Sequence, residues 1–391
     1  MRARPELEVL LVSRPLAPGV HDGTVELVRT LAIESAASLR CTVFVPAGTR
    51  SPTPGVRGRP AALPEVLPRA LRDRSWRPLS FLSLAAAPRG VIRHYFFTPT
   101  PRVVHLLRRL HQIRPGPSVQ TLCSTPPDAV PLGPLLFADR VVALTEHTRR
   151  RLLTDGVDPA RVVTIPPAVH PPDWMTSSAG GGTIDGARQR QRARTRHRLG
   201  LPADTPLILY MGDYDEAGAA LAVAEALPRI LTHTSAHAVL ACRPKGAHHD
   251  EVRSLVKERL AASEVAADRV HLLGTIDWSR ELAATADVAL FPAARLPDKM
   301  DLPLALLESL VAGVPAVVAD RGPLVDLIRA KAAVGAPADS PERLAAEAIR
   351  LLTDVGAHRI AAAGGRRWCE QEGSPSRLAE RHLDLYTSLR T

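Results

Sequence analysis

The feature of this sequence that most restricts its fold is a repeated alternation of short apolar runs with longer stretches that have helical spacing. The apolar runs are rich in Val and Leu, and the alternation continues through both halves of the chain. Such a pattern is typical of parallel sheets with helices on both faces. The runs predict strands at residues 7–13, 41–46, 90–97, 118–122, 140–144, 161–166, 207–212, 237–242, 269–274, 288–292 and 315–319.

The grouping of these strands predicts an α/β protein with two doubly wound Rossmann-like domains. We expect the domains over residues 1–175 and 199–375, since 391 residues are enough for two separate cores. Between them, residues 176–198 contain a Gly/Ser tract and then Arg at alternate positions, without an apolar face. This segment is expected to be a basic linker, flexible or loosely helical. A closing helix over residues 376–391 is expected to cross back to the first domain.

Composition excludes several classes of protein. No apolar run approaches the roughly 18 residues of a spanning helix, so we expect a soluble protein. The four cysteines lack CxxC spacing, so neither disulfides nor a zinc site is predicted, and we expect a protein of the reducing cytoplasm without a cofactor.

The net charge of +10 lies in the first half and the linker, and residues 1–175 carry 23 Lys and Arg against 13 Asp and Glu. No aromatic-rich or zinc-finger pattern accompanies this charge, which argues against nucleic-acid binding. A basic face instead suits a phosphate-bearing substrate or a peripheral contact with the anionic inner face of a membrane.

Candidate binding residues of the first half lie in loops at the carboxyl ends of strands, where doubly wound sheets bind ligands. Gly19 and Gly23 border a turn before a helix expected near Thr24, where glycine allows a close approach and the helix start offers N–H groups. A plain strand-to-helix turn explains the same glycines. His94 ends a strand and either orients a hydroxyl or phosphate or is simply packed. Residues 102–114 form a basic amphipathic helix that either covers the sheet or lies on a membrane.

The second half has a clearer arrangement. A glycine turn follows a strand at Gly212, Arg243 and Lys245 directly follow the next strand, and Thr275 and Ile276 lie in the turn after the third. These loops are expected to meet at one edge of the sheet.

The segment 296–322 predicts a turn, an amphipathic helix and a buried strand. Asp301 is expected to cap a helix that begins near Leu302 and has Pro303 in its first turn. The helix start can bind a diphosphate through backbone N–H groups, and Glu308 can accept two hydrogen bonds from ribose hydroxyls.

In order and spacing, these segments resemble the family 4 retaining glycosyltransferases of GT-B architecture, in which two domains face a central cleft. The resemblance implies transfer of a sugar, with retention, from a nucleotide-diphosphate sugar to a glycan or lipid-linked acceptor, as in polysaccharide or glycolipid biosynthesis. It places the donor on the second domain and the acceptor against the first. The segments that carry it are residues 138–169, 207–212, 270–293, 302–320 and 383–389. The implied donor-binding residues are Gly212, Arg243, Lys245, Thr275, Ile276, Leu302, Pro303, Leu304 and Glu308.

The sequence departs from the family at charged positions. The family pattern has two Glu eight residues apart; Glu308 fits the second position, but Met300 occupies the first. The usual Arg and Lys after the opening strand of the second domain are represented by Asp213 and Ala217. Two readings follow. One is a variant donor site in which other charges compensate; the other is a catalytically inactive GT-B subunit that binds nucleotide sugar or glycan without transfer.

In the variant-site reading, the cations that compensate are Arg243, Lys245 and Lys299, and Asp301 replaces the absent Glu. The expected catalytic residues are therefore His94, Lys299 and Asp301, with Gly19 and Gly23 on the acceptor side.

Overall fold

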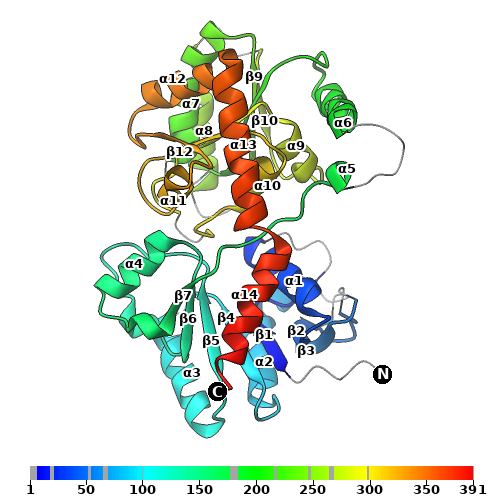
Figure 1. Cartoon of the computed structure of the whole chain (residues 1–391), viewed down its shortest axis with the longest axis vertical. Coiled ribbons are helices and arrows are strands. Elements are labelled where there is room, and N and C mark those ends of the chain that lie inside the picture. The colour runs from blue at the N-terminus through cyan, green and yellow to red at the C-terminus, as the bar shows by residue number, and fades with distance from the viewer. Residues whose placement is uncertain are drawn as a thin grey trace. The chain divides into compact units, whose positions relative to one another are not determined.

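The computed structural model describes residues 7–17, 22–51, 54–64, 69–98, 100–176, 184–214, 218–244, 248–263, 268–296 and 299–390. Within these residues the strands form two separate sheets, and every strand pair in both sheets is parallel. Helices alternate with the strands along the chain (Figure 1). The fold is therefore α/β, with two doubly wound Rossmann-like sheets.

The first sheet has the strand order β3-β2-β1-β4-β5-β6-β7 among the described residues. Its strands are β1 (Glu8–Val12), β2 (Arg40–Pro46), β3 (Arg57–Ala62), β4 (Ile92–Phe96), β5 (Ser118–Leu122), β6 (Arg140–Ala143) and β7 (Val162–Thr164). Its helices are α1 (Gly23–Ser35), α2 (Arg69–Ala85), α3 (Pro101–Ile113), α4 (Glu146–Thr154) and α14 (Pro375–Thr387), with 3-10 turns η1 (Gly133–Leu135) and η2 (Pro159–Arg161).

Burial on both faces explains why these strands read as continuous apolar runs. Every residue of β4 and β5 is buried, including polar ones. Before α1, Asp22 is extended and its carboxylate accepts a hydrogen bond from the Thr24 N–H at 2.9 Å, which caps the helix. The strand order reverses between β1 and β4, so their carboxyl ends border the crevice where such sheets bind ligands.

The second sheet has the order β10-β9-β8-β11-β12-β13 among the described residues. Its strands are β8 (Leu207–Asp213), β9 (His237–Arg243), β10 (Val270–Leu273), β11 (Val288–Phe291), β12 (Ala316–Ala319) and β13 (Val334–Ala336). Its helices are α5 (Asp173–Thr176), α6 (Ile184–Arg198), α7 (Ala219–His233), α8 (His249–Ala261), α9 (Ser279–Thr285), α10 (Leu304–Val311), α11 (Val325–Arg329), α12 (Pro341–Thr353) and α13 (Val355–Gln371).

Glycine ends the helix that matters most for the candidate site. Gly313 follows α10 with a φ of 76°, a left-handed conformation that residues with a Cβ atom rarely adopt. A Cβ atom there would also collide with the Arg366 guanidinium. The turn at Gly313 therefore allows β12 to start directly after α10.

The chain divides into two compact units, each built from segments that are separated in the sequence. One unit comprises the described residues of Met1–Ala168, Pro297–Asp301 and Ser374–Thr391; the other comprises those of Val169–Leu296 and Leu302–Gly373. The closing helix α14 packs against α1 in the first unit (Figure 1). A short segment before α10 also belongs to the first unit, which the boundaries expected from the sequence did not include.

The basic segment expected to be a loose linker contains an anchored helix. Arg196 of α6 is fully buried, and its guanidinium donates to the Asp287 carboxylate at 2.7 Å. Asp287 also binds Arg192 and accepts the Leu207 N–H at 2.7 Å. Burial lowers the pKa of Arg196 to about 10, and Asp287 opposes that shift. Helix α6 has no apolar face, but the arginines that bind Asp287 hold it against the rest of the second unit.

No helix among the described residues is both long enough and apolar enough to cross a membrane.

Candidate functional site

The adjacent ends of β8 and β9 carry opposite charges in the second unit. Asp213 is buried at the end of β8, and half-exposed Arg243 at the end of β9 places its Nε 3.8 Å from the Asp213 Oδ1. Gly212 precedes Asp213, and a Cβ atom there would lie 2.6 Å from the Tyr210 hydroxyl. Arg243 thus stands at the expected edge, but Asp213 balances part of its charge.

The helix α10 begins later than the sequence predicts. Its first residue is Leu304 and its N-cap residue is Pro303, whose side chain makes no capping hydrogen bond. Leu302 is buried in the core of the second unit, whereas Pro303 and Leu304 are partly exposed. The backbone N–H groups of the first helical turn therefore lie next to accessible residues and suit an anion.

Glu308 lies on α10 and contacts a side chain from the neighbouring helix. The Arg280 Nε of α9 donates to the Glu308 Oε1 at 3.1 Å. The Glu308 side chain is 18% exposed and that of Arg280 is 64% exposed, so both reach solvent. The carboxylate expected to bind ribose is thus oriented by an arginine that the sequence did not single out.

Asp301 does not have the position expected of a catalytic or sugar-binding carboxylate. It is buried in the first unit, where its two carboxylate oxygens accept from the Thr125 N–H at 2.8 Å, the Thr125 hydroxyl at 2.6 Å and the Thr148 hydroxyl at 2.6 Å. Burial raises its pKa to about 6, and the threonine hydrogen bonds oppose the rise. Asp301 therefore neither caps α10 nor presents its oxygens to a donor sugar. It anchors the segment before α10.

Met300 and Gly23 meet in the first unit. A Cβ atom added at Gly23, the first residue of α1, would lie 3.4 Å from the Met300 Cε, and the Met300 side chain is buried. The position at which the family pattern has its first Glu is thus filled by a thioether packed on the start of α1. Lys299 next to it is partly exposed. Gly19 and Lys245 lie outside the described residues.

His94 is a core residue of the first unit rather than a residue open to substrate. It is fully buried on β4, with its Nδ1 2.6 Å from the Tyr386 hydroxyl and its Nε2 2.6 Å from the Thr121 hydroxyl. Burial lowers its pKa well below the ordinary value, and His382 adds to the shift. Both ring nitrogens are occupied, so the packed reading of His94 fits and the expected catalytic role does not.

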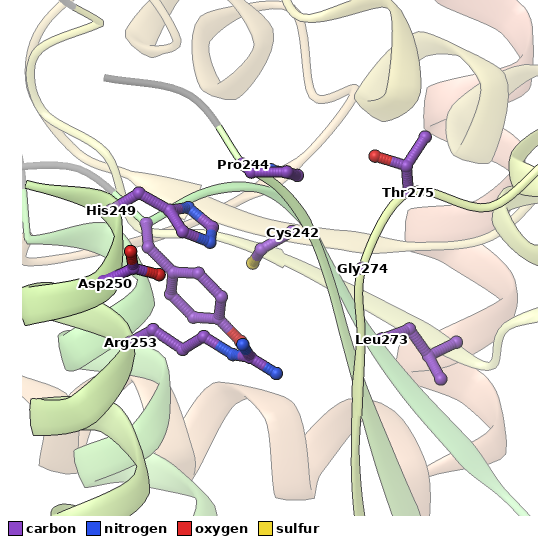
Figure 2. Close-up of a pocket in the computed structure, with 9 residues that line it drawn as sticks. Cys242, Pro244, His249, Asp250, Arg253, Leu273, Gly274 and Thr275 are labelled. Atoms are coloured by element: carbon purple, nitrogen blue, oxygen red, sulfur yellow. The ribbon is translucent and has the colours of Figure 1, made fainter. Parts of the chain in front are cut away.

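A pocket of about 460 Å³ lies in the second unit beside the carboxyl ends of β8, β9 and β10. Figure 2 shows His249, Asp250 and Arg253 of α8 on one side and the Leu273–Thr275 turn on the other, with Cys242 and Pro244 between them. Ile276, expected beside Thr275, is partly exposed. The residues that line the pocket are Tyr214, Cys242, Pro244, His249, Asp250, Arg253, Leu273, Gly274 and Thr275.

The pocket wall combines rings with balanced charge. The Tyr214 and His249 rings lie 5.2 Å apart between centroids at 64°, and the His249 Nδ1 is buried without a hydrogen-bond partner among the described residues. Burial and the Cys242 thiol raise the pKa of Tyr214, so its hydroxyl keeps its proton. Asp250 and Arg253 have opposite charges. This lining suits a neutral, flat polar group better than an isolated phosphate.

Sequence reasoning missed Tyr214, His249 and Arg253 because the pocket joins strand ends, a turn and helix α8, which are separated along the chain. The position of Tyr214 directly after a predicted strand was the signal that could have singled it out. In the described part of the chain, no group of three or more His, Cys, Asp or Glu side chains is placed to bind a metal ion.

Comparison with known proteins gives a family match over the second unit. Residues 205–354 match the family described as Glycosyl transferases group 1. The glycosyltransferase match thus includes the ends of β8 and β9, the pocket residues and α10. It does not extend to the first sheet.

Curated glycosyltransferases match part of the chain, and solved structures have a similar fold. D-inositol 3-phosphate glycosyltransferases of Geodermatophilus obscurus and Salinispora arenicola are 30% and 29% identical over 202 and 239 residues, which cover 49% and 59% of this chain. The matched regions span 40% and 50% of those relatives. The fold is similar to Alr3699/HepE of Anabaena in complex with UDP and glucose, with a TM-score of 0.72, 13% identity and coverage of 98% of this chain and 100% of that one. Sucrose-phosphate synthase of Thermosynechococcus elongatus also has a TM-score of 0.72, with 19% identity and coverage of 98% and 99%.

Proposed function

We propose that this chain is a glycosyltransferase that moves a sugar, with retention, from a nucleotide-diphosphate sugar to a glycan or lipid-linked acceptor. The observation that carries the proposal is the grouping of donor-type chemistry at the carboxyl ends of the second sheet, inside the residues that match the group 1 family. Arg243, Glu308, the start of α10 and the pocket of Figure 2 all belong to this unit. Doubly wound sheets bind their ligands at such an edge.

Each part of the nucleotide diphosphate has a chemical counterpart in this unit. The N–H groups at the start of α10 and the Arg243 guanidinium are donors for a diphosphate, whose developing negative charge is stabilised best by groups fixed before the reaction. The Glu308 carboxylate accepts from ribose hydroxyls. The pocket holds the base between ring-bearing and polar walls. Lys245 follows β9 in the sequence and adds a further positive charge.

Fewer residues support the proposed acceptor site in the first unit. His94 and Asp301 are sealed inside the first unit, so neither is proposed to contact the reacting atoms. Gly19 and Gly23 border the loop before α1, which remains the proposed acceptor loop. Retention is supported by the family resemblance rather than by a carboxylate in the site.

A donor panel tests the proposal directly. The purified chain is mixed with UDP-, GDP- and ADP-sugars, and thermal shift is measured beside donor hydrolysis or transfer. We expect at least one donor both to stabilise the chain and to be consumed. Arg243→Ala should slow consumption about 10-fold or more, because a charge-assisted contact contributes about 1.5 to 3 kcal/mol. Arg329→Ala, which removes an exposed arginine of α11 in the same unit, is the control.

A second candidate is a GT-B subunit that binds nucleotide sugar or glycan without transfer. The burial of Met300 and Asp301 favours it, because no carboxylate replaces the first Glu of the family pattern among the described residues before α10. Stabilisation by a donor without any hydrolysis or transfer would support this candidate. Absence of stabilisation by every nucleotide would contradict donor binding altogether.

A further inference from the structure

The contact between Arg280 and Glu308 joins two neighbouring helices of the second unit. Arg280 lies in the first turn of α9 and Glu308 near the middle of α10. The Nε of the guanidinium is 3.1 Å from the Glu308 Oε1, which is hydrogen-bond distance between charged groups. The proposed donor site does not otherwise involve Arg280.

The position of Arg280 is set by packing on both sides of it. Trp278 precedes α9 as its N-cap residue, and the Arg198 guanidinium lies over the Trp278 ring, 5.3 Å from its centroid. Behind Arg280, Leu282 of α9 is fully buried in the same apolar core as Leu306 and Leu307 of α10. The two helices therefore hold the arginine and the carboxylate at a fixed spacing.

The contact with Arg280 takes up only part of the acceptor capacity of the Glu308 carboxylate. Each carboxylate oxygen accepts up to two hydrogen bonds, so the Arg280 Nε uses one of the lone pairs on Oε1. Glu308 is still 18% exposed. A carboxylate that binds two adjacent hydroxyls must present its oxygens in one orientation, and a long side chain loses rotamer freedom when it does so. A fixed cation at one oxygen removes much of that freedom in advance.

We propose that Arg280 is a positioning residue for the sugar ring of the nucleotide: it holds Glu308 in the orientation that accepts the vicinal 2′- and 3′-hydroxyls of a ribose. The inference rests on the proposed function, because it takes the ligand of Glu308 to be a nucleotide. It goes beyond that function by assigning discrimination between ribose and 2′-deoxyribose to the Arg280–Glu308 pair.

The test compares UDP, GDP and ADP with their 2′-deoxy forms by titration calorimetry. We expect the wild type to prefer the ribonucleotides. Arg280→Gln should weaken ribonucleotide binding about five-fold, as expected when one exposed ion pair is lost, and should weaken 2′-deoxynucleotide binding less. The ratio between the two affinities should therefore fall. Arg280→Lys keeps the charge without the planar guanidinium and should restore only part of the ratio.

A double-variant cycle separates positioning from direct contact. In the Glu308→Gln background, Arg280→Gln should have no further effect on the ratio, since Arg280 acts through the carboxylate. The matched control is Arg259→Gln, which removes an exposed arginine whose Nε is 3.6 Å from Glu225 on the neighbouring helix α7. It should leave both affinities unchanged.

The outcomes distinguish this inference from the proposed function. Binding to the wild type with an unchanged ribose to 2′-deoxyribose ratio in Arg280→Gln overturns the inference alone. An effect of Arg280→Gln that persists undiminished in the Glu308→Gln background overturns it too, because Arg280 would then contact the nucleotide itself or act only on the fold. No binding of any of the six nucleotides to the wild type overturns the proposed function and the inference together.

Discussion

At the residue scale, the first unit contains two histidines, His94 and His382, that burial keeps neutral. His382 lies 5.4 Å from His94 between ring centroids, and its Nδ1 is 2.8 Å from the Leu378 carbonyl oxygen. Burial lowers the pKa of both histidines. A proton added to either ring would place a charge in a site without a carboxylate contact among the described residues, so these rings make the fold sensitive to acid.

Replacing His382 with Leu should reduce the loss of stability in acid. The pKa of His382 is about 4 in the folded chain, against 6.5 for an ordinary histidine. The unfolded chain therefore binds more protons below pH 6.5, and the contribution of neutral His382 is full above that pH and is lost as the pH falls toward 4. The loss is about 3 kcal/mol in the free energy of unfolding. Urea unfolding between pH 4 and 8 measures it.

The His382→Leu variant is compared with the wild type at each pH and with a control variant, His105→Leu. Asp301 contributes with the opposite sign, because its raised pKa lets the folded chain bind a proton at higher pH than the unfolded chain does. The difference between variant and wild type is therefore compared at each pH. His105→Leu, at an exposed position on α3, should leave the profile unchanged. A His382→Leu profile parallel to that of the wild type would contradict the prediction.

Residue types could be read from the sequence, but their partners could not. His94 was predicted at a strand end but is the central residue of β4, and the Tyr386 hydroxyl that occupies its Nδ1 is 292 residues away in the chain. Asp301 was expected to face a donor, yet its oxygens are bound by Thr125, 176 residues earlier. Glu308 was predicted on the helix after Pro303 and lies there, but Arg280 was not considered. The tertiary fold determines which polar side chains are buried and which groups they bind, and sequence patterns do not report either.

At the element scale, the apolar runs predicted strands well because both faces of each parallel sheet are covered. All the strands predicted from apolar runs are present. β3 and β13 were missed because their sequences, RGRPAA and VGA, contain no run rich in Val and Leu. Helix α6 was missed as a fixed element because a buried arginine holds it in place, and periodicity of apolar residues does not report such an anchor.

Arg196→Ala should strongly destabilise the second unit. The Arg196 guanidinium is fully buried and binds Asp287, the Thr205 carbonyl and the Thr285 carbonyl. Its removal takes this donor from two carbonyl oxygens and leaves Asp287 with Arg192 as its cation. Each buried group left unsatisfied costs about 1 to 3 kcal/mol. The urea midpoint measures the loss. Arg194→Ala, exposed on the same helix, is the control, and equal effects of the two substitutions would contradict an anchoring role.

Helix α3 has the chemistry for a peripheral contact with an anionic membrane. Leu106 and Ile113 are 45% and 74% exposed, and they alternate with exposed Arg102 and Arg109 along one stripe of the helix. The helix contains no acidic residue. Its other side, with Val104 and the buried leucines, covers the sheet. The sheet-covering interpretation thus applies to the buried face, and the membrane interpretation is a prediction for the exposed face.

Vesicles that contain phosphatidylserine should sediment the chain at low ionic strength and release it as salt is added. The double variant Arg102→Gln/Arg109→Gln should bind about 30-fold more weakly, since each basic residue near such a surface contributes about 1 kcal/mol. Arg343→Gln/Arg359→Gln, with two exposed arginines of the second unit, is the matched control. Binding that salt does not weaken, or that the α3 substitutions do not change, would exclude this surface.

At the scale of the whole molecule, the first unit depends on the last helix. Leu378, Leu385 and Tyr386 of α14 are buried, and the helix packs on α1. A chain that ends at Gly373 should therefore lose about 5 kcal/mol or more in the stability of the first unit, judged from the cost of removing buried leucines. The second unit should keep its nucleotide affinity. Urea unfolding beside nucleotide titration checks both, and a chain that ends at Thr387 is the control.

The interleaving of the two units has a consequence for the order in which the chain is completed during synthesis. A ribosome makes His94 early, but it must add 292 more residues before Tyr386 exists to occupy the His94 ring. At about 5 to 20 residues per second, that wait is on the order of 15 to 60 seconds. The second unit, whose last residue is Gly373, is finished before α14 has been made. The first unit therefore completes its core after the second unit, once α14 packs on α1 and the Tyr386 hydroxyl reaches the His94 ring.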